Sequence, residues 1–278
     1  DEMYKLTDIL GKNTFVPKIP EEINSKVREL PFISIVSLTY NRKNFFPLAL
    51  MNYKGIDYPE ELIEWIIVDD SNESDIVEDL IPKDLARVRY IKLEGKHSIG
   101  EKRNIGCKES KGDYIAFMDD DDIYQPRHLL IKLAYLKHYN KPCCYSTSIG
   151  CFHIEKLIST INVPPMEHSP EKRVSEATMM FQKSFWENRK FDSLSNGSEG
   201  GSFIKDRYVE CVEVPWRQSI ISLLHDKNTS NRVKNIGSEP NGCHFGLSDE
   251  LFSFITNINN TDSVQIEDIT DSVQIEDI

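Results

Sequence analysis

The feature that most constrains the fold is an alternation of short apolar runs with helical patterns between residues 32 and 119. The apolar runs are FISIVSLTY (32–40), EWIIVDD (64–70), ARVRYIKL (86–93) and DYIAFMD (113–119). The helical patterns lie between them, at 45–53, 75–81 and 98–111. Apolar strands that alternate with helices indicate a parallel sheet covered on both faces. We therefore predict an α/β chain with a Rossmann-like half.

The alternation breaks down after Pro126. Residues 127–139 have helical periodicity, and longer runs at 143–154 and 176–185 favour antiparallel strands. A Gly/Ser-rich loop at 195–207 runs into a helix, further strands follow, and the chain beyond His225 favours loops over the face of the domain. The second half is thus predicted to be a mixed extension of the first.

The predicted organisation is one main domain with two flanking segments. The parts are an irregular or briefly helical arm (1–30), a first half (31–130), a second half (131–250) and a C-terminal segment (251–278). That last segment contains two copies of TDSVQIEDI, beginning at Thr261 and Thr270. We interpret them as an appended acidic repeat without a catalytic role, although their alternating Val and Ile can pair as a strand.

Composition excludes several classes of protein. The net charge is −12, and −6 without the six acids of the repeat, which argues against binding to nucleic acid or an anionic membrane. No run of eighteen apolar residues exists and the N-terminus lacks a secretory pattern, so we expect a soluble, cytoplasmic protein without a membrane span. The chain starts at Asp1 without Met, which leaves upstream targeting open, and the oligomeric state is open too. The six cysteines form no CxxC or zinc pattern and are expected to be buried thiols.

Polar residues gather where three of the predicted strands end. They are Thr39 to Arg42, Asp69 to Ser71 and Asp119 to Asp122. Ligands in open α/β sheets bind beyond the carboxyl ends of the strands, at the point where strand order switches. We therefore expect these three segments to form one crevice.

The four consecutive carboxylates in AFMDDDDIYQP are the most informative of these groups. Unit charges about 4 Å apart repel by roughly 4 kcal/mol at an effective dielectric near 20. In an extended segment Asp119 and Asp121 face the same side, and such a pair can hold a hard divalent cation that also binds phosphates. Complementing the next helix N-terminus explains one acid but not four. An EF-hand is excluded because Tyr124 and Leu130 stand where its Gly and Glu are needed.

Three linked motifs carry a family resemblance: SIVSLTYNR, EWIIVDDSNESD and IGEKRNIGCKESKGDYIAFMDDDDIYQPRHL. In this order and spacing they resemble the nucleotide-binding half of GT-A glycosyltransferases, specifically the family-two-like group. The similarity covers about residues 32–130. It implies a GT-A fold, with a C-terminal part that binds the acceptor.

The resemblance implies a set of donor-binding residues. They are Thr39, Tyr40, Arg42, Asp70, Lys102, Arg103, Asn104, Asp119 and Asp120. In this interpretation Tyr40 stacks on the base, Asp70 accepts a hydrogen bond from uracil, and the basic stretch lies against the diphosphate. Asp121 and Asp119 correspond to the DxD pair that binds Mn²⁺ or Mg²⁺, and His225 completes the metal shell.

The acceptor side departs from the family pattern. Members usually carry a Glu-Asp pair at the start of a helix below the acceptor, whereas this chain has Glu199 followed by Gly200. Glu199 is therefore the predicted general base, favoured by the helix N-terminus and partial burial. Trp216 and Asp122 are weaker acceptor-side candidates.

The resemblance implies transfer of a hexose from a UDP-sugar, UDP-glucose before UDP-galactose, to a hydroxyl of a glycan or glycoprotein, with inversion. Two alternatives remain at this stage. A sugar nucleotidyltransferase typically has a Gly-rich loop after its first strand, where this chain reads LTYNR. A non-catalytic carbohydrate-binding module would need no DxD and would bind sugar in the presence of chelator.

Overall fold

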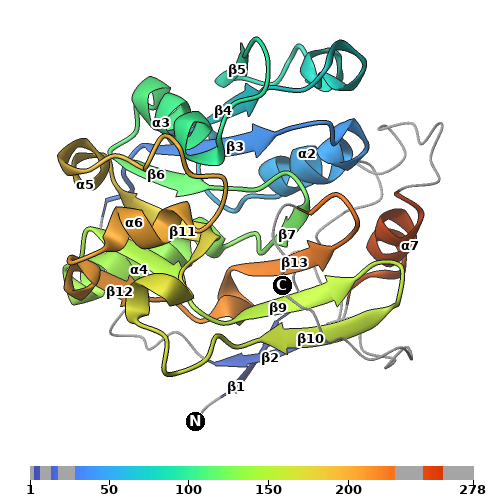
Figure 1. Ribbon diagram of the computed structural model, residues 1–278. Helices are drawn as coiled ribbons and strands as arrows, with labels where there is room; N and C mark the ends of the chain where they lie inside the picture. The colour runs from blue at the N-terminus through green and yellow to red at the C-terminus, as the bar shows by residue number, and fades with distance from the viewer. Residues whose placement is uncertain (1–2, 7–13, 18–28, 229–246, 259–278) are drawn as a thin grey trace.

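The computed structural model describes residues 3–6, 14–17, 29–228 and 247–258, and its main feature is a seven-stranded mixed sheet (Figure 1). The strand order is β12-β8-β11-β6-β3-β4-β5. Its parallel part consists of β3 (Ile33–Thr39), β4 (Ile63–Asp69), β5 (Val88–Lys92) and β6 (Tyr114–Phe117). These strands match the four predicted apolar runs, so the predicted α/β class is confirmed.

The order of the parallel strands positions the crevice. The chain runs outward from β3 to β4 and β5, and then returns as β6 on the other side of β3. The switch in strand order therefore lies between β3 and β6, and a ligand is expected beyond their carboxyl ends. The segments that begin at Thr39 and Asp119 follow these two strands, as the sequence predicts.

The sheet separates two hydrophobic cores because side chains alternate along each strand. Ile33 and Ile35 pack into the core that includes α2 (Phe46–Lys54) and α4 (His128–Tyr139). Val36 and Leu38 face the opposite core, whose helices are α3 (Ile99–Glu109), α5 (Lys183–Asn188) and α6 (Glu199–Ile204). Figure 1 shows α3, α5 and α6 together on the left of the sheet. Both faces are thus covered by helices.

The second half adds three strands to the sheet, of which only β11 runs antiparallel to the rest, and two predictions need correction. The run 143–154 forms two strands rather than one, β8 (Cys143–Ser146) and β9 (Ile149–His153), which belong to different sheets. The chain bends at Thr147 and Ser148, where polar residues interrupt the apolar run, so the sequence did carry a sign of the break. The run 176–185 is not one long strand, because it forms β11 (Ser175–Gln182) and then continues as the helix α5. The edge strand β12 is the short segment Cys211–Glu213.

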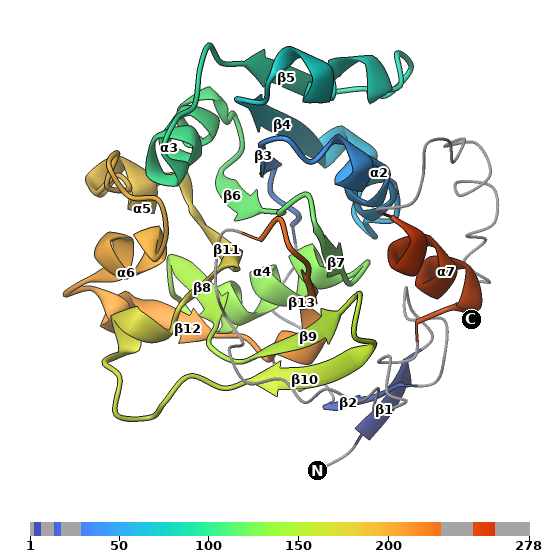
Figure 2. The same cartoon turned by 45° about the vertical axis from the view of Figure 1, so that its right-hand side comes forward.

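A second, four-stranded sheet has the order β10-β9-β13-β7. Its other members are β7 (Asp122–Tyr124), β10 (Ile158–Asn162) and β13 (Ile220–Leu224). Figure 2 shows it beside α7 (Asp249–Asn257), and Phe152, Leu223 and Leu251 belong to the core that they share. Because β13 pairs antiparallel with β7, the end of β13 lies next to the acidic loop.

Several other predictions need correction. The expected helix at 75–81 is a pair of 3-10 turns (73–75 and 78–80), and part of the expected loop beyond His225 is the helix α7. Within the described part of the N-terminal arm, the chain forms the antiparallel strands β1 (Met3–Leu6) and β2 (Thr14–Pro17), and the helix expected as an alternative for this arm is not tested. The acidic repeat at 261–278 lies outside the described residues, as does Cys243.

Two findings concern the cysteines and the membrane. The five cysteines within the described ranges are all free, and four of them are buried, as expected. Among the helices that the structure describes, none combines the length and apolar character needed to span a bilayer.

Candidate functional site

The site lies on the acidic loop between β6 and β7. Asp119, Asp121 and Asp122 each present a carboxylate oxygen within 4.8 Å of the others. The backbone of the loop is held in place on both sides: Tyr124 Oη accepts the N–H of Asp119 at 2.8 Å, and Asn52 Nδ2 donates to the carbonyl of Asp122 at 2.7 Å. The three carboxylates are therefore brought together by the fold rather than by a flexible chain.

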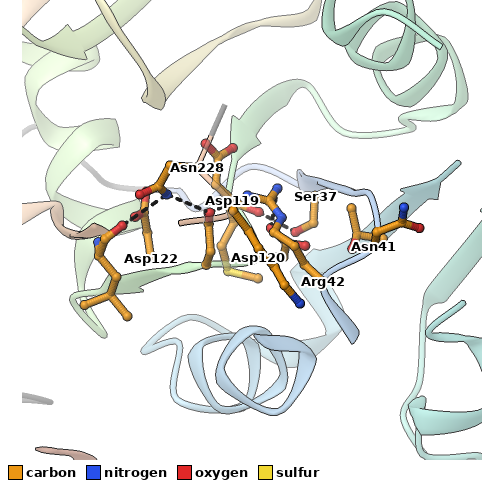
Figure 3. Close-up of polar contacts among 12 residues, drawn as sticks. Ser37, Asn41, Arg42, Asp119, Asp120, Asp122 and Asn228 are labelled. Atoms are coloured by element: carbon orange, nitrogen blue, oxygen red, sulfur yellow. Dashed lines mark hydrogen bonds and ion pairs between the residues drawn. The ribbon is translucent and has the colours of Figure 1, made fainter. Parts of the chain in front are cut away.

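Arg42 compensates the charge of the loop from the end of β3 (Figure 3). One guanidinium nitrogen lies 2.7 Å from Asp120 Oδ1, and another contacts Asp121. The turn that aims Arg42 is fixed by Asn41, which adopts φ 52° and bonds to Ser71 and Asn72 in the loop after β4. Asn tolerates this left-handed conformation better than most residues. The loops after the first two strands thus act as one unit.

The acidic loop shows how strongly the charges interact. Burial and the neighbouring Asp121 raise the pKa of Asp120 to about 7, against the opposing effect of Arg42. Burial also tends to raise the pKa of Asp121, but Arg42 and His225 outweigh it and lower that pKa to about 2. Asp121 is therefore a carboxylate held in its charged form, which is the form that binds a cation.

His225 and Asn228 approach Asp121 from the segment after β13. His225 Nε2 lies 3.1 Å from Asp121 Oδ2, and Asn228 Nδ2 lies 3.3 Å from the same oxygen. Phe45 stacks on the imidazole, with 4.2 Å between ring centroids. The sequence predicted the closeness of His225 to Asp121. Oxygen ligands with one imidazole suit Mn²⁺ or Mg²⁺ in kind, so the residues present fit a divalent cation.

Asp122, which the sequence named as a weaker acceptor-side candidate, also belongs to this cluster. Its Oδ1 accepts the N–H of Leu223 at 3.0 Å, because β7 and β13 pair at this point. The motif thus contributes three candidate metal ligands instead of two.

The three residues of the basic stretch of α3, Lys102, Arg103 and Asn104, make different contacts. Lys102 Nζ donates to Asp70 Oδ1 at 2.5 Å and to the carbonyl of Thr39 at 3.2 Å, and burial lowers the pKa of Lys102 despite Asp70. The other oxygen of Asp70 accepts the N–H of His97 at 2.8 Å. Lys102 also faces the Tyr40 ring at 5.9 Å. Asp70 and Lys102 are a buried ion pair at the edge of the predicted donor site.

Arg103 extends across the site towards α6. Its Nε donates to Glu199 Oε1 at 2.6 Å, one of its terminal nitrogens lies 3.8 Å from Asp119 Oδ1, and it packs 4.1 Å from the centroid of the Phe117 ring. Burial alone would lower the pKa of this guanidinium, but Glu199 and Asp119 outweigh it and the pKa rises. Arg103 therefore connects the predicted base to the acidic loop.

Two predicted residues do not reach the site. Asn104 donates from Nδ2 to the carbonyl of Phe191 at 2.9 Å, and its Oδ1 accepts the N–H groups of Phe191 and Trp186, so it fastens α3 to the segment after α5. Trp216 covers Gly150 on β9, where an added Cβ would lie 2.4 Å from Cζ3 of the ring. Neither residue lines the cavity, so both predictions need correction.

A cavity of about 150 Å³ lies between the acidic loop and α6. The predicted residues that line it are Tyr40, Arg42, Lys102, Arg103, Asp119, Asp121, Asp122 and Glu199. The structure buries Thr39, Asp70, Asp120 and His225, which do not line this cavity. Asn228, at the start of the Asn-Thr-Ser triplet after His225, and Glu176 also line the cavity, and sequence reasoning missed Glu176. The only signal for Glu176 is a tertiary one: β11 runs antiparallel to β6, so its first residues lie at the carboxyl edge of the parallel strands.

The region from residue 34 to residue 192, more than half of the chain, matches the family model for glycosyl transferase family 2. The chain belongs to this family. An uncharacterized glycosyltransferase of Haemophilus influenzae is 37% identical over 95 residues, which cover 34% of this chain and 31% of that protein. The GalNAc(5)-diNAcBac-PP-undecaprenol beta-1,3-glucosyltransferase of Campylobacter jejuni is 29% identical over 97 residues, 34% of this chain and 30% of that protein. The matched region thus spans about a third of the length of these relatives.

Solved structures share the fold. Residues 1–349 of Staphylococcus aureus TarS, in complex with UDP-GlcNAc, superpose with a TM-score of 0.56 at 17% identity, covering 71% of this chain and 60% of that one. The mannosyltransferase PcManGT of Pyrobaculum calidifontis, in complex with GDP-Man and Mn²⁺, gives a TM-score of 0.55 at 14% identity and covers 73% and 59%. At such identities the similarity establishes the fold alone, and the predicted GT-A fold is confirmed.

Proposed function

We propose that this family member transfers a hexose from a UDP-sugar to a hydroxyl of a glycan or glycoprotein, with a divalent metal, and that the reaction inverts the anomeric centre. The observation that carries the proposal is the set of three carboxylates within 4.8 Å of one another in a cavity that Glu199 and Glu176 also line. The carboxylate cluster suits a metal and a diphosphate, and the two glutamates suit an acceptor hydroxyl. UDP-glucose is the favoured donor and UDP-galactose the next.

The relatives support the donor class. The TarS structure contains UDP-GlcNAc, the PcManGT structure contains GDP-Man and Mn²⁺, and the Campylobacter jejuni relative is named as a glucosyltransferase. In this chain the choice of UDP rests on Asp70, because a carboxylate can accept the N–H of uracil. Since Asp70 is paired with Lys102, we expect the pair to bind the base as a unit.

The reaction needs negative charge to be stabilised as the bond between the sugar and the diphosphate breaks. A bound Mn²⁺ or Mg²⁺ supplies that stabilisation. Asp119, Asp121 and Asp122 would hold the ion, with His225 adjacent. Arg42 sits where it can exchange its contact with Asp121 for one with the diphosphate. The proton of the acceptor hydroxyl passes to the carboxylate of Glu199 or Glu176. Arg103 holds Glu199 in position.

Nucleoside diphosphate release tests the proposal. The purified chain is incubated with Mn²⁺ and UDP-glucose, UDP-galactose, UDP-GlcNAc or GDP-mannose, and the released UDP or GDP is measured with and without a glycan acceptor. We expect release from a UDP-hexose that EDTA abolishes and Asp121→Asn greatly reduces. No release from any donor would reject the proposal, and faster release from GDP-mannose would reject the assignment of Asp70.

A further inference from the structure

Besides the acidic loop, the cavity is lined by two glutamates that come from different elements. Glu199 is the first residue of α6, and Glu176 lies at the start of β11. Both line the cavity, but their surroundings differ. Glu199 is only 3% exposed and its Oε1 accepts from Arg103 at 2.6 Å, whereas Glu176 is partly exposed. Glu199 is therefore held in a buried ion pair with Arg103, whose pKa is lowered by burial but raised by the charge of Glu199 and, less strongly, by that of Glu176.

Glu176 occupies the space beside Gly200. Its Oε1 accepts the N–H of Gly200 at 3.1 Å. A Cβ added at Gly200 would lie 2.8 Å from Cγ of Glu176, closer than real Cβ contacts, and 3.0 Å from both Oε1 of Glu176 and Cγ1 of Val174. A side chain at position 200 would therefore displace the Glu176 side chain. The carboxylate of Glu176 lies within about 3 Å of where a side chain at position 200 would begin.

From this geometry we propose that Glu176 is the general base that activates the acceptor hydroxyl. The inference rests on the proposed function and identifies a residue that the sequence motifs did not point to. It also accounts for Gly200, the position at which this chain departs from the Glu-Asp pattern: the carboxylate comes from β11 instead of α6. Glu199 is then a positioning residue, which holds Arg103 3.8 Å from Asp119.

Each bond that forms in this step is matched by one that breaks. The acceptor O–H gives its proton to a carboxylate oxygen of Glu176, and the oxygen electron pair forms the new bond to the anomeric carbon. The bond from that carbon to the diphosphate oxygen breaks, and its electron pair leaves with the nucleoside diphosphate. When water replaces the acceptor, the same proton transfer accompanies hydrolysis of the donor, which allows an assay without an identified acceptor.

Two isosteric variants discriminate between the carboxylates. In Glu176→Gln the amide oxygen still accepts the N–H of Gly200, so the fold is kept, but the base is lost. We expect kcat for UDP release from the best UDP-hexose to fall by about 100-fold or more, with unchanged Tm and unchanged affinity for UDP and Mn²⁺. In Glu199→Gln we expect a lower Tm, because Arg103 loses a buried counter-charge, and a loss of less than about tenfold in kcat per folded molecule.

A double variant moves the carboxylate back to α6. Glu176→Ala removes the closest atoms beside position 200 and leaves Val174 Cγ1 at 3.0 Å from an added Cβ, and adding Gly200→Asp supplies a carboxylate there. We expect Glu176→Ala to be as slow as Glu176→Gln, and the double variant to recover to within about tenfold of wild type. The Glu176→Ala parent is the matched control for folding and for donor affinity.

The outcomes separate this inference from the proposed function. If wild type releases no nucleoside diphosphate from any donor, the proposed function fails and the inference falls with it. If wild type is active but Glu176→Gln retains its turnover, or if Glu199→Gln is the slower of the two, only the assignment of the base is overturned. A folded double variant that stays as slow as Glu176→Ala overturns it as well.

Discussion

Arg42→Met removes the cation that holds the acidic loop together. The Arg42 side chain is 15% exposed and bridges Asp120 and Asp121, whose side chains are 2% and 7% exposed. Removing one partner of a buried ion pair costs about 3 to 5 kcal/mol, because the other charge stays buried and unpaired. For a chain of this size such a loss lowers Tm by roughly 10 °C. The variant should therefore be folded but clearly less stable than wild type.

Thermal unfolding with and without Mn²⁺ measures both halves of this prediction. In wild type, Mn²⁺ competes with Arg42 for Asp121, whereas in the variant it meets uncompensated carboxylates. A ligand at 100 times its Kd stabilises the folded state by about 2.7 kcal/mol, so Mn²⁺ should recover much of the loss and raise Tm more in the variant.

The matched control for this prediction is Arg89→Met, which breaks a partly exposed pair with Glu109 and should cost at most about 1 kcal/mol. Equal Tm for Arg42→Met and wild type, or an equal gain from Mn²⁺ in both, would refute the reasoning.

Three further substitutions test other parts of the structure. Burial lowers the pKa of Lys132 from 10.5 to about 8, so its charged form destabilises the folded state below that pH. Urea titrations should show Lys132→Met more stable than wild type by about 3 kcal/mol at neutral pH, with most of the difference gone by pH 10.5; equal stability at neutral pH would contradict this. Gly100→Ala places a Cβ 1.9 Å from the carbonyl oxygen of Asp192, so its Tm should fall by an amount equivalent to about 1 to 3 kcal/mol. Asn104→Ala should lower Tm, because it removes two hydrogen bonds to the Phe191 backbone, and should leave the Kd for UDP unchanged in calorimetry. Weaker binding of UDP at unchanged Tm would show that Asn104 belongs to the donor site.

The parallel half of the fold was predictable because its signal is local. Each of its strands is an apolar run closed by polar residues, and the strand-end rule then brings Thr39 and Asp119 to one edge of the sheet. The closeness of His225 to Asp121 depended on the family resemblance, because 104 positions separate the two residues. The structure places His225 Nε2 3.1 Å from Asp121 Oδ2, as the resemblance implied.

The remaining features depend on tertiary contacts that no local pattern encodes. Asn104 lies in the expected basic stretch, but the helical turn directs its amide towards Phe191 rather than the cavity. The break between β8 and β9 falls at the polar residues Thr147 and Ser148, but nothing local tells that the two strands join different sheets. Glu176 could have been found only from the antiparallel pairing of β11 with β6, which the sequence does not state.

The most direct test of the site is calorimetric titration of UDP into the protein, with Mn²⁺ or with EDTA, for wild type and Asp121→Asn. If the carboxylates of the acidic loop hold a divalent ion that receives the diphosphate, UDP binds wild type only with Mn²⁺ and does not bind Asp121→Asn under either condition. Equal binding of UDP in EDTA, or unchanged binding to Asp121→Asn, would contradict the metal-dependent site.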